Sequence, residues 1–343
     1  MSIVKIKPKI GILSPITQEW IHLHYDKIDI THNINETDFI LYESNGDPIH
    51  IIENIKKCFP KKKLIFILSG DQNAHIDNEC IWFSNAVKPS GLASRQTQIF
   101  VINQAIFKFY EHKTSILNNK IELELELELD KTTNSNLHSK IHSKIHSRPI
   151  DICFKGTIWD GMRTDMYNNF SIKPKCEIIK NNQYWSWRLN STIKPTQLQL
   201  ENVANDLYKT IIKSKLCLCP KGNGNSSMRI IEALVCGSIP VLINDFTSPF
   251  GISWGRNIDE FCLSFNTEKD NWDFIYNECI KLLEDTPRLE KMQQNGKDYF
   301  KNVIYIDSKM PAFKMYNNID SVCFGFSKLI IDNIIDIFEQ IEK

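Results

Sequence analysis

One stretch of the sequence, "KLCLCPKGNGNSSMRIIEALVCGSIPVLIND" (residues 215–245), constrains the fold more than any other. It starts with a short apolar run and continues through a loop rich in glycine and asparagine. An apolar segment with helical spacing follows and ends at Gly237, and a second apolar run completes the stretch. A strand, a helix and a strand within about 30 residues form a βαβ unit, which needs a right-handed crossover and a parallel sheet. The sequence therefore predicts an α/β domain around this stretch.

The first third of the chain carries the same pattern. "DFILYESNGD" (residues 38–47) and "KKKLIFILSGDQ" (61–72) are apolar runs that end in polar turns, and helical spacing lies between them. "ECIWFS" (79–84) adds a short strand-like run, and "QTQIFVINQAIFKFYEH" (96–112) has the spacing of an amphipathic helix. The length of 343 residues fits two domains of about 100–200 residues each.

Residues 121–148 differ from both patterns. "IELELELELD" alternates strictly, and "LHSKIHSKIHSR" repeats every four residues. The repeat places His138, His142 and His146 at the spacing of one helical face, which would suit a zinc site. No carboxylate or thiol lies nearby in the sequence to complete such a site, and low-complexity repeats are typical of solvated linkers. We therefore expect a linker or insertion and no metal site.

Composition excludes several classes of function. Lys plus Arg and Asp plus Glu number 41 each, so the chain has no overall field that would attract nucleic acid or an anionic membrane. No run reaches the roughly 18–20 apolar residues that span a bilayer, and the start lacks an apolar leader. We expect a cytoplasmic protein, and the richness in Lys, Ile and Asn is typical of an AT-rich genome, such as that of a large virus (then in the host cytoplasm) or a protist.

Cysteine usage agrees with a reducing compartment. The sequence has 10 cysteines without a C-x-x-C pair, and in a chain of this length free buried thiols are more common than a disulfide framework. Cys217 and Cys219 lie two apart within an apolar run, so we expect both on one face of a strand.

The glycine-rich loop predicts an anion site. Gly222 and Gly224 permit positive φ angles and close approach of a ligand, and Ser226 or Ser227 can begin the next helix, whose free N–H groups attract anions. Neither a phosphate-binding G-x-x-x-x-G-K-[ST] motif nor the third glycine of a dinucleotide fingerprint is present, which argues against a Rossmann oxidoreductase.

Two charged residues follow that loop at helical spacing. Arg229 could hold phosphate oxygens through parallel hydrogen bonds, with Lys221 as a second cation. Glu232 lies one turn further along the same face, where a carboxylate could accept hydrogen bonds from the two hydroxyls of a ribose. The alternative is an exposed salt bridge between residues three apart, which contributes only a few tenths of a kcal/mol.

Several short motifs here occur in a known order. "CPKG" (219–222), "SMRIIEA" (227–233), "GSIPV" (237–241) and "PF" (249–250) resemble the signature of the exostosin-like glycosyltransferases, family 47. The resemblance implies a GT-B fold, with two facing Rossmann-like domains, a cleft between them and the nucleotide sugar held by the C-terminal domain. It also implies transfer of a sugar from a nucleotide donor, UDP-linked, to a glycan acceptor. A non-catalytic nucleotide- or glycan-binding module of the same fold is the alternative.

The resemblance and the patterns together divide the chain. We expect an acceptor-side domain over residues 1–120, the linker over 121–148 and the donor-binding domain over 149–310. The apolar stripe of "SKLIIDNIIDIFEQIEK" then places a helix within 311–343 that packs back towards the first domain.

The expected donor site combines the loop with the end of the preceding strand. Arg163 is a second phosphate candidate, or else an exposed arginine at a helix start. No obvious Asp-x-Asp motif is present, so we expect no required cofactor, and Mn²⁺ is not indicated. The predicted donor-binding residues are Lys155, Gly156, Arg163, Pro220, Lys221, Gly222, Asn223, Gly224, Asn225, Ser226, Ser227, Arg229 and Glu232.

A general base would come from the first domain if the anomeric centre inverts. Asp71 follows the run "LIFILSG" and Glu43 follows "FILY", and ligands of open α/β sheets bind beyond the carboxyl ends of strands. A solvated turn residue is the alternative for both. Asn244 and Asp245 after "IPVLI" could contact the donor sugar or form a plain turn, and "YWSWR" (184–188) could stack on a sugar or a base or belong to the core.

Overall fold

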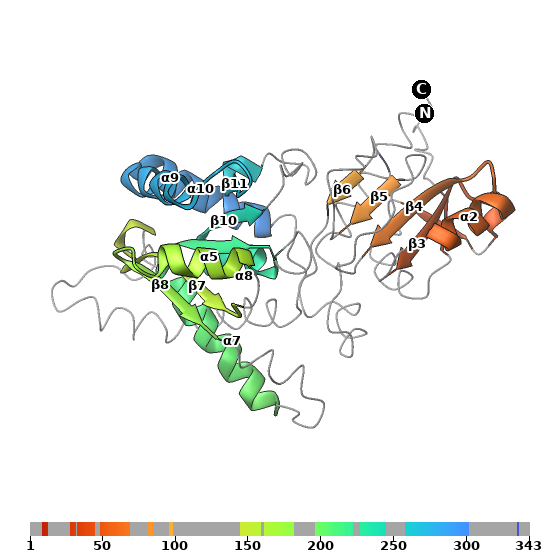
Figure 1. The fold of residues 1–343 in the computed structure, drawn as a ribbon. Coiled ribbons are helices and arrows are strands. Elements are labelled where there is room, and N and C mark those ends of the chain that lie inside the picture. Colours follow the sequence, from red (N-terminus) through yellow and green to blue (C-terminus); the bar gives the residue numbers. More distant parts are fainter. Residues whose placement is uncertain are drawn as a thin grey trace, which may run out of the picture.

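The protein is described by a computed structural model. The structure describes residues 9–12, 28–31, 33–44, 49–68, 81–84, 96–98, 145–158, 161–181, 196–221, 227–244, 258–301 and 335. Two parallel sheets make up its core, one in each half of the chain (Figure 1).

The first sheet has six strands, and every described pairing in it is parallel. Its order is β2-β1-β3-β4-β5-β6. The apolar run at 38–47 forms β3 and its partner at 61–72 forms β4, with α2 between them, so the predicted βαβ unit is confirmed. The strands and helices are β1 (Lys9–Ile12), β2 (Asp29–Thr31), a 3-10 turn η2 (Ile34–Glu36), β3 (Phe39–Ser44), α2 (Ile49–Cys58), β4 (Lys63–Leu68), β5 (Ile81–Ser84) and β6 (Gln96–Gln98).

Burial explains why this unit forms. Ile52 and Ile55 of α2 pack against Ile40, Leu64 and Phe66 of the neighbouring strands β3 and β4.

The helix prediction over 96–112 is wrong at its start, because Gln96–Gln98 pair with β5 as an edge strand. Tertiary pairing overrides the helical spacing there, and the rest of that segment lies outside the described residues.

The second sheet has five parallel strands in the order β11-β10-β9-β7-β8. The stretch at 215–245 supplies β9, α8 and β10, as predicted. The strands are β7 (Ile150–Gly156), β8 (Cys176–Lys180), β9 (Ser214–Pro220), β10 (Ile239–Asn244) and β11 (Leu263–Asn266). The helices are a 3-10 turn η4 (Ile145–Ser147), α5 (Gly161–Phe170), α7 (Gln197–Ile212), α8 (Met228–Cys236), a 3-10 turn η6 (Ile258–Glu260), α9 (Trp272–Glu284) and α10 (Thr286–Tyr299).

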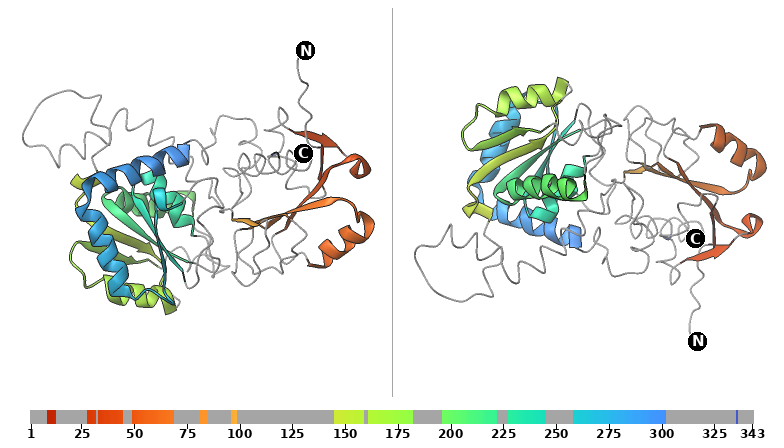
Figure 2. Two further views of the ribbon diagram at one scale, coloured as in Figure 1. Left: turned by 90° about the horizontal axis from the view of Figure 1, so that it is seen from above. Right: turned by 90° about the horizontal axis from the view of Figure 1, so that it is seen from below.

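Helices cover both faces of this sheet (Figure 2). Alternate strand residues such as Phe154, Leu218 and Val241 form one core with residues of α5, α9 and α10. The helices α7 and α8 pack against each other and against β9. Two parallel sheets with helices covering both faces of the second confirm the predicted fold class, α/β with two Rossmann-like units as in GT-B enzymes.

The last residues of the predicted linker belong to the second unit. Ile145 is fully buried in its core, and the guanidinium of Arg148 donates to the backbone carbonyls of Ser214 (2.8 Å) and Cys236 (3.0 Å). The unit therefore begins a few residues before 149. The other domain boundaries stay predictions, because most of 121–148 and of 311–343 lies outside the described residues.

Two further predictions concern the cysteines and membrane-spanning segments. The cysteines of the described part are free, and Cys217 and Cys219 are both buried in β9. The Sγ of Cys219 donates to the carbonyl of Cys217 at 3.2 Å. Within the described residues, the helices are all too short or too polar to span a bilayer.

Candidate functional site

The strand order of the second sheet creates a switch point between β7 and β9. The chain leaves β7 to add β8 on one side, whereas β9 pairs on the other side and is followed by β10. In open α/β sheets, ligands bind in the crevice at the carboxyl ends of the strands where the order reverses. Those ends carry Gly156 on β7 and Pro220 on β9, which the sequence also selected.

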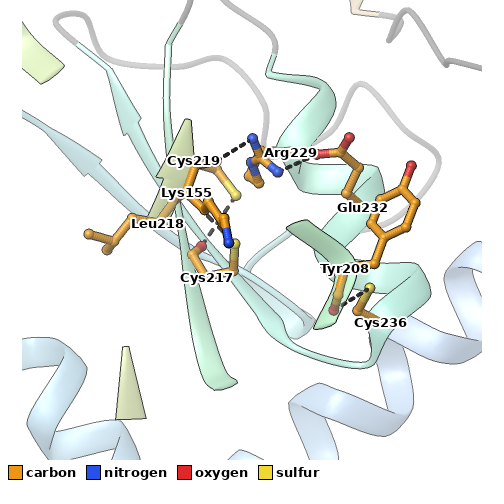
Figure 3. Close-up of polar contacts among 8 residues, drawn as sticks. All are labelled: Lys155, Tyr208, Cys217, Leu218, Cys219, Arg229, Glu232 and Cys236. Atoms are coloured by element: carbon orange, nitrogen blue, oxygen red, sulfur yellow. Dashed lines mark hydrogen bonds and ion pairs between the residues drawn. The ribbon is translucent and has the colours of Figure 1, made fainter. Parts of the chain in front are cut away.

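Two arginines tie these strand ends together in a reciprocal way. Arg229, in the first turn of the helix after β9, donates Nη2 to the carbonyl of Lys155 on β7 at 2.8 Å (Figure 3). Arg163, in the first turn of the helix after β7, donates Nε to the carbonyl of Lys221 beyond β9 at 3.2 Å. Its Nη1 also donates to the carbonyl of Thr157 at 3.1 Å. Arg229, which follows β9, thus holds the end of β7, and Arg163, which follows β7, holds the end of β9.

Arg229 also forms an ion pair with Glu232. Nη1 lies 2.8 Å from Oε2, and the two side chains are only 15% and 14% exposed. Nε and Nη1 are buried without a hydrogen bond, so the 2.8 Å contact of Nη1 is an ion pair without hydrogen-bond alignment. Burial has the largest single effect and by itself would lower the pKa of Arg229, but the Glu232 carboxylate and the nearby cysteines Cys217, Cys219 and Cys153 together outweigh it and raise the pKa. The residue stays cationic and keeps N–H donors that no described group accepts.

Glycine at position 156 leaves room for this guanidinium. A Cβ there would lie 3.4 Å from Nη2 of Arg229 and 3.1 Å from Cζ of Phe154. The ammonium of Lys155 points away from the ion pair, since it lies 2.6 Å from Asp206 Oδ2 and 3.5 Å from Thr210 Oγ1 of α7. Lys155 therefore contributes its carbonyl to Arg229, while its charge is paired on α7.

A family model matches the part of the sequence that contains this site. The Exostosin GT47 domain matches residues 89–262, just over half of the chain. The chain belongs to the exostosin GT47 family. A probable glycosyltransferase of Arabidopsis thaliana is 33% identical over an alignment of 87 residues, and the match covers 21% of this chain and 17% of that protein. The chain therefore matches only a small part of that relative's length.

The solved structures that resemble this GT47 chain have lower sequence identity to it than the Arabidopsis protein has. A GtfA/B complex has a TM-score of 0.35 at 11% identity, covering 86% of this chain and 57% of that one. The wall teichoic acid polymerase TagF has a TM-score of 0.25 at 12% identity, covering 89% and 90%. At these scores neither structure carries an argument about the site.

The matched GT47 segment contains all the predicted donor-binding residues, and the structure brings the described ones together. Lys155, Gly156, Arg163, Lys221 and Arg229 meet at the switch point through the contacts above. Both alternatives to binding need revision: Arg163 is not simply an exposed helix-start residue, and the Arg229–Glu232 salt bridge is formed but buried. The predicted residues that lie outside the described ones are Gly222, Asn223, Gly224, Asn225 and Ser226.

The helix start differs in detail from the prediction. Ser227 is the N-cap of α8, but its side chain makes no capping hydrogen bond. Pro220 is buried at the end of β9, where it pairs with Ile243. Because α8 is antiparallel to its flanking strands, its N-terminus opens towards their carboxyl ends, at the same place as the arginines.

Other predicted residues of the GT47 chain are placed less fully. Glu43 is in β3, opposite Ile67 of β4, and its side chain is not described. Asp71 lies outside the described residues, as does the segment 184–188. Nδ1 of His146 lies 3.2 Å from Glu290 Oε1, while His138 and His142 are outside the described part. Within that part, no cluster of three or more His, Cys, Asp or Glu residues suits a metal ion.

Sequence reasoning missed several partners of the site. The carbonyls of Lys155, Thr157 and Lys221 gave no signal, because any residue carries one. Tyr208 of α7 is buried near Glu232, and burial followed by that carboxylate raises its pKa well above the usual value (Figure 3). Its position depends on how α7 packs against α8, which no local pattern specifies.

Proposed function

We propose that the protein is a glycosyltransferase that moves a sugar from a UDP-linked donor to a glycan acceptor. The observation that carries this proposal is the reciprocal pair of arginines at the β7/β9 switch point, inside the segment that the exostosin GT47 model matches. Ligands of α/β sheets bind at such points, and two fixed guanidinium groups there favour a ligand with several negative charges.

The cationic groups would stabilise the departing nucleoside diphosphate. Negative charge grows on the diphosphate as the bond to the sugar breaks, so fixed positive charge close to it lowers the barrier. Arg229 has buried N–H donors without acceptors among the described residues, and the N-terminus of α8 adds its dipole. In this proposal no divalent metal is required, and Glu232 binds the ribose hydroxyls.

The acceptor hydroxyl would be deprotonated by a carboxylate of the first domain. Asp71 is our first choice for this general base and Glu43 the second, because Glu43 lies near the carboxyl end of β3 and Asp71 follows the run of β4 by three residues in the sequence. A base is needed only if the reaction inverts the anomeric centre.

The first test is a calorimetric titration of UDP in EDTA. We expect the wild-type protein to bind UDP and an Arg229→Ala, Glu232→Ala double variant to lose most of that affinity. A double variant of the exposed pair Glu278–Lys281, Glu278→Ala with Lys281→Ala, serves as the matched control and should bind as the wild type does. Absence of UDP binding to the wild-type protein, with and without Mn²⁺, would count against the proposal.

Turnover separates catalysis from simple binding. Release of UDP from UDP-sugars, with oligosaccharide acceptors present, should be seen for the wild-type protein. Asp71→Asn should abolish turnover and leave the Kd for UDP unchanged. A protein that binds UDP yet releases none from any donor and acceptor combination would instead be a binding module of the same fold.

A further inference from the structure

Asn244 has the most unusual environment of the polar residues at the carboxyl ends of the second sheet. It is the last residue of β10 and is 1% exposed, and neither Oδ1 nor Nδ2 has a hydrogen-bond partner. Buried amides are nearly always satisfied, because a donor or acceptor that loses its hydrogen bonds to water on burial and gains none in the protein is destabilising. Its backbone carbonyl accepts hydrogen bonds from Thr267 N (2.7 Å) and Oγ1 (3.0 Å), so the main chain is fixed and the amide alone is unused.

The alternation of β10 determines which way this amide points. Val241 and Ile243 belong to the core that includes α5 and α9, so Leu242 and Asn244 face the opposite side, where α8 packs on β10. Leu242 is in register with Cys219, and Lys221 N donates to the carbonyl of Ile243 at 3.0 Å. Asn244 is therefore next to Lys221, at the carboxyl ends of the strands and on the face of α8.

The start of α8 lies at this same end. The helix has nine residues and receives no side-chain cap from Ser227, and the N-terminus of an α-helix attracts anions through the N–H groups and dipole of its first turn. Arg229 lies in this turn and holds the end of β7. A helix N-terminus and an unsatisfied buried amide, two independent features, thus meet beside the proposed phosphate site.

We propose that the carboxamide of Asn244 binds a sugar hydroxyl of a ligand whose phosphate is held at the N-terminus of α8. This inference rests on the proposed function and names a residue that selects the ligand. A hydroxyl both donates and accepts, and a carboxamide offers one acceptor and two donors, so the two groups satisfy each other. Being neutral, the amide also avoids the repulsion that a carboxylate would exert on a neighbouring phosphate.

The hydroxyl belongs either to the ribose of the nucleotide or to the transferred sugar, and binding data distinguish the two. Wild-type protein and Asn244→Leu are titrated with UDP, UDP-glucose, UDP-galactose, UDP-glucuronate and UDP-N-acetylglucosamine. If the hydroxyl is on the transferred sugar, Asn244→Leu binds UDP normally and the preferred UDP-sugar about tenfold more weakly. If it is on the ribose, every ligand loses affinity by a similar factor.

A stability measurement separates ligand binding from a structural role. Replacing an unsatisfied buried amide by an apolar side chain of similar size should leave the midpoint of thermal unfolding unchanged or raise it by a few degrees, about 2–4 °C. Asn266 is the matched control, since it is the register partner of Asn244 on β11 and its Oδ1 accepts Glu268 N at 3.0 Å. Asn266→Leu should lower the midpoint.

The outcomes are distinct. Unchanged affinities of Asn244→Leu for all five ligands, with binding by the wild type, would overturn this inference and leave the proposed function standing. A lowered unfolding midpoint with unchanged binding would assign Asn244 a structural role. No binding of any ligand to the wild-type protein would overturn the proposed function, and this inference with it.

Discussion

At the scale of single residues, burial decides what the Arg229–Glu232 pair contributes. A spacing of three along an exposed helix predicts a stabilisation of a few tenths of a kcal/mol. Here both side chains are more than four-fifths buried, so water stabilises each charge little and the opposite charge of its partner takes the place of water. Removing one partner of such a pair leaves an uncompensated buried charge, which costs about 3–5 kcal/mol.

A double-mutant cycle tests this directly. We expect Arg229→Met and Glu232→Gln each to lower the free energy of unfolding by about 3–5 kcal/mol, and the double variant to lose less than the sum. The coupling energy should reach about 1–3 kcal/mol in urea unfolding. The exposed pair Glu278–Lys281, with Nζ 2.6 Å from Oε1, provides the comparison. Its coupling should stay under about 0.5 kcal/mol, and equal values for the two pairs would contradict the burial argument.

The sequence could identify these residues and the possible Arg229–Glu232 ion pair, but not the backbone partners of the two arginines. Charge, spacing and the glycine loop marked Arg229, Glu232 and Arg163 as candidates. The hydrogen-bond acceptors of the two arginines are backbone carbonyls at the ends of β7 and β9. These two strands become neighbours only because β8 pairs on the far side of β7. The order of strands across a sheet is not written in local periodicity, so the reciprocal ties were beyond prediction.

At the scale of elements, periodicity and caps predicted most of the second unit. The strands β9 and β10 and the helix α8 fall where the apolar runs and Gly237 place them. The error at Gln96–Gln98 arises because an edge strand of three residues has too few positions to show a period of two. Hydrophobic periodicity in the sequence predicts long helices and strands, whereas a short strand forms where a neighbouring strand is available to pair with it.

The end of α8 illustrates this consistency and can be tested. Gly237 has a φ of 68°, and a Cβ there would lie 3.1 Å from Nη2 of Arg148. Gly237→Ala should therefore lower the free energy of unfolding by at least about 1–2 kcal/mol, since alanine strains in the left-handed region and crowds the guanidinium.

Gly161 offers the matched control for that substitution. It is the first residue of α5, and a Cβ at this position would meet nothing within 4 Å. Gly161→Ala should be neutral or stabilising by up to about 1 kcal/mol, because it restricts the unfolded chain. Chemical denaturation of the two variants beside the wild type measures both effects, and similar losses in both would refute the conformational explanation.

At the scale of the whole molecule, buried thiols link the second unit to pH. Cys153, Cys217, Cys262 and Cys279 are buried, and burial raises the pKa of each thiol above 9.0. Burial also raises the pKa of Cys176 to about 12. These groups come from β7, β8, β9, α9 and the residue before β11, so their protonation reports on the integrity of the entire unit.

The sign of the pH dependence follows from these shifts. The folded state keeps the thiol protons above pH 9, whereas the unfolded chain releases them near its ordinary pKa of 9.0. The contribution of these thiols to the free energy of unfolding is fully present below pH 9. It is lost as the pH rises towards their pKa values in the folded state, by about 1 kcal/mol for each buried thiol at pH 10. Arg148 acts in the opposite direction, because burial lowers its pKa to about 10, so the clearest window lies between pH 8 and pH 10.

Urea unfolding in the presence of a reductant measures this loss. The free energy of unfolding should fall by several kcal/mol between pH 8 and pH 10, and a Cys153→Ala, Cys217→Ala variant should show a shallower fall over the same range. These two cysteines are register partners on β7 and β9, so the variant removes two neighbouring thiols. An identical pH dependence in both proteins would mean that other groups, not the thiols, set the alkaline limit of the fold.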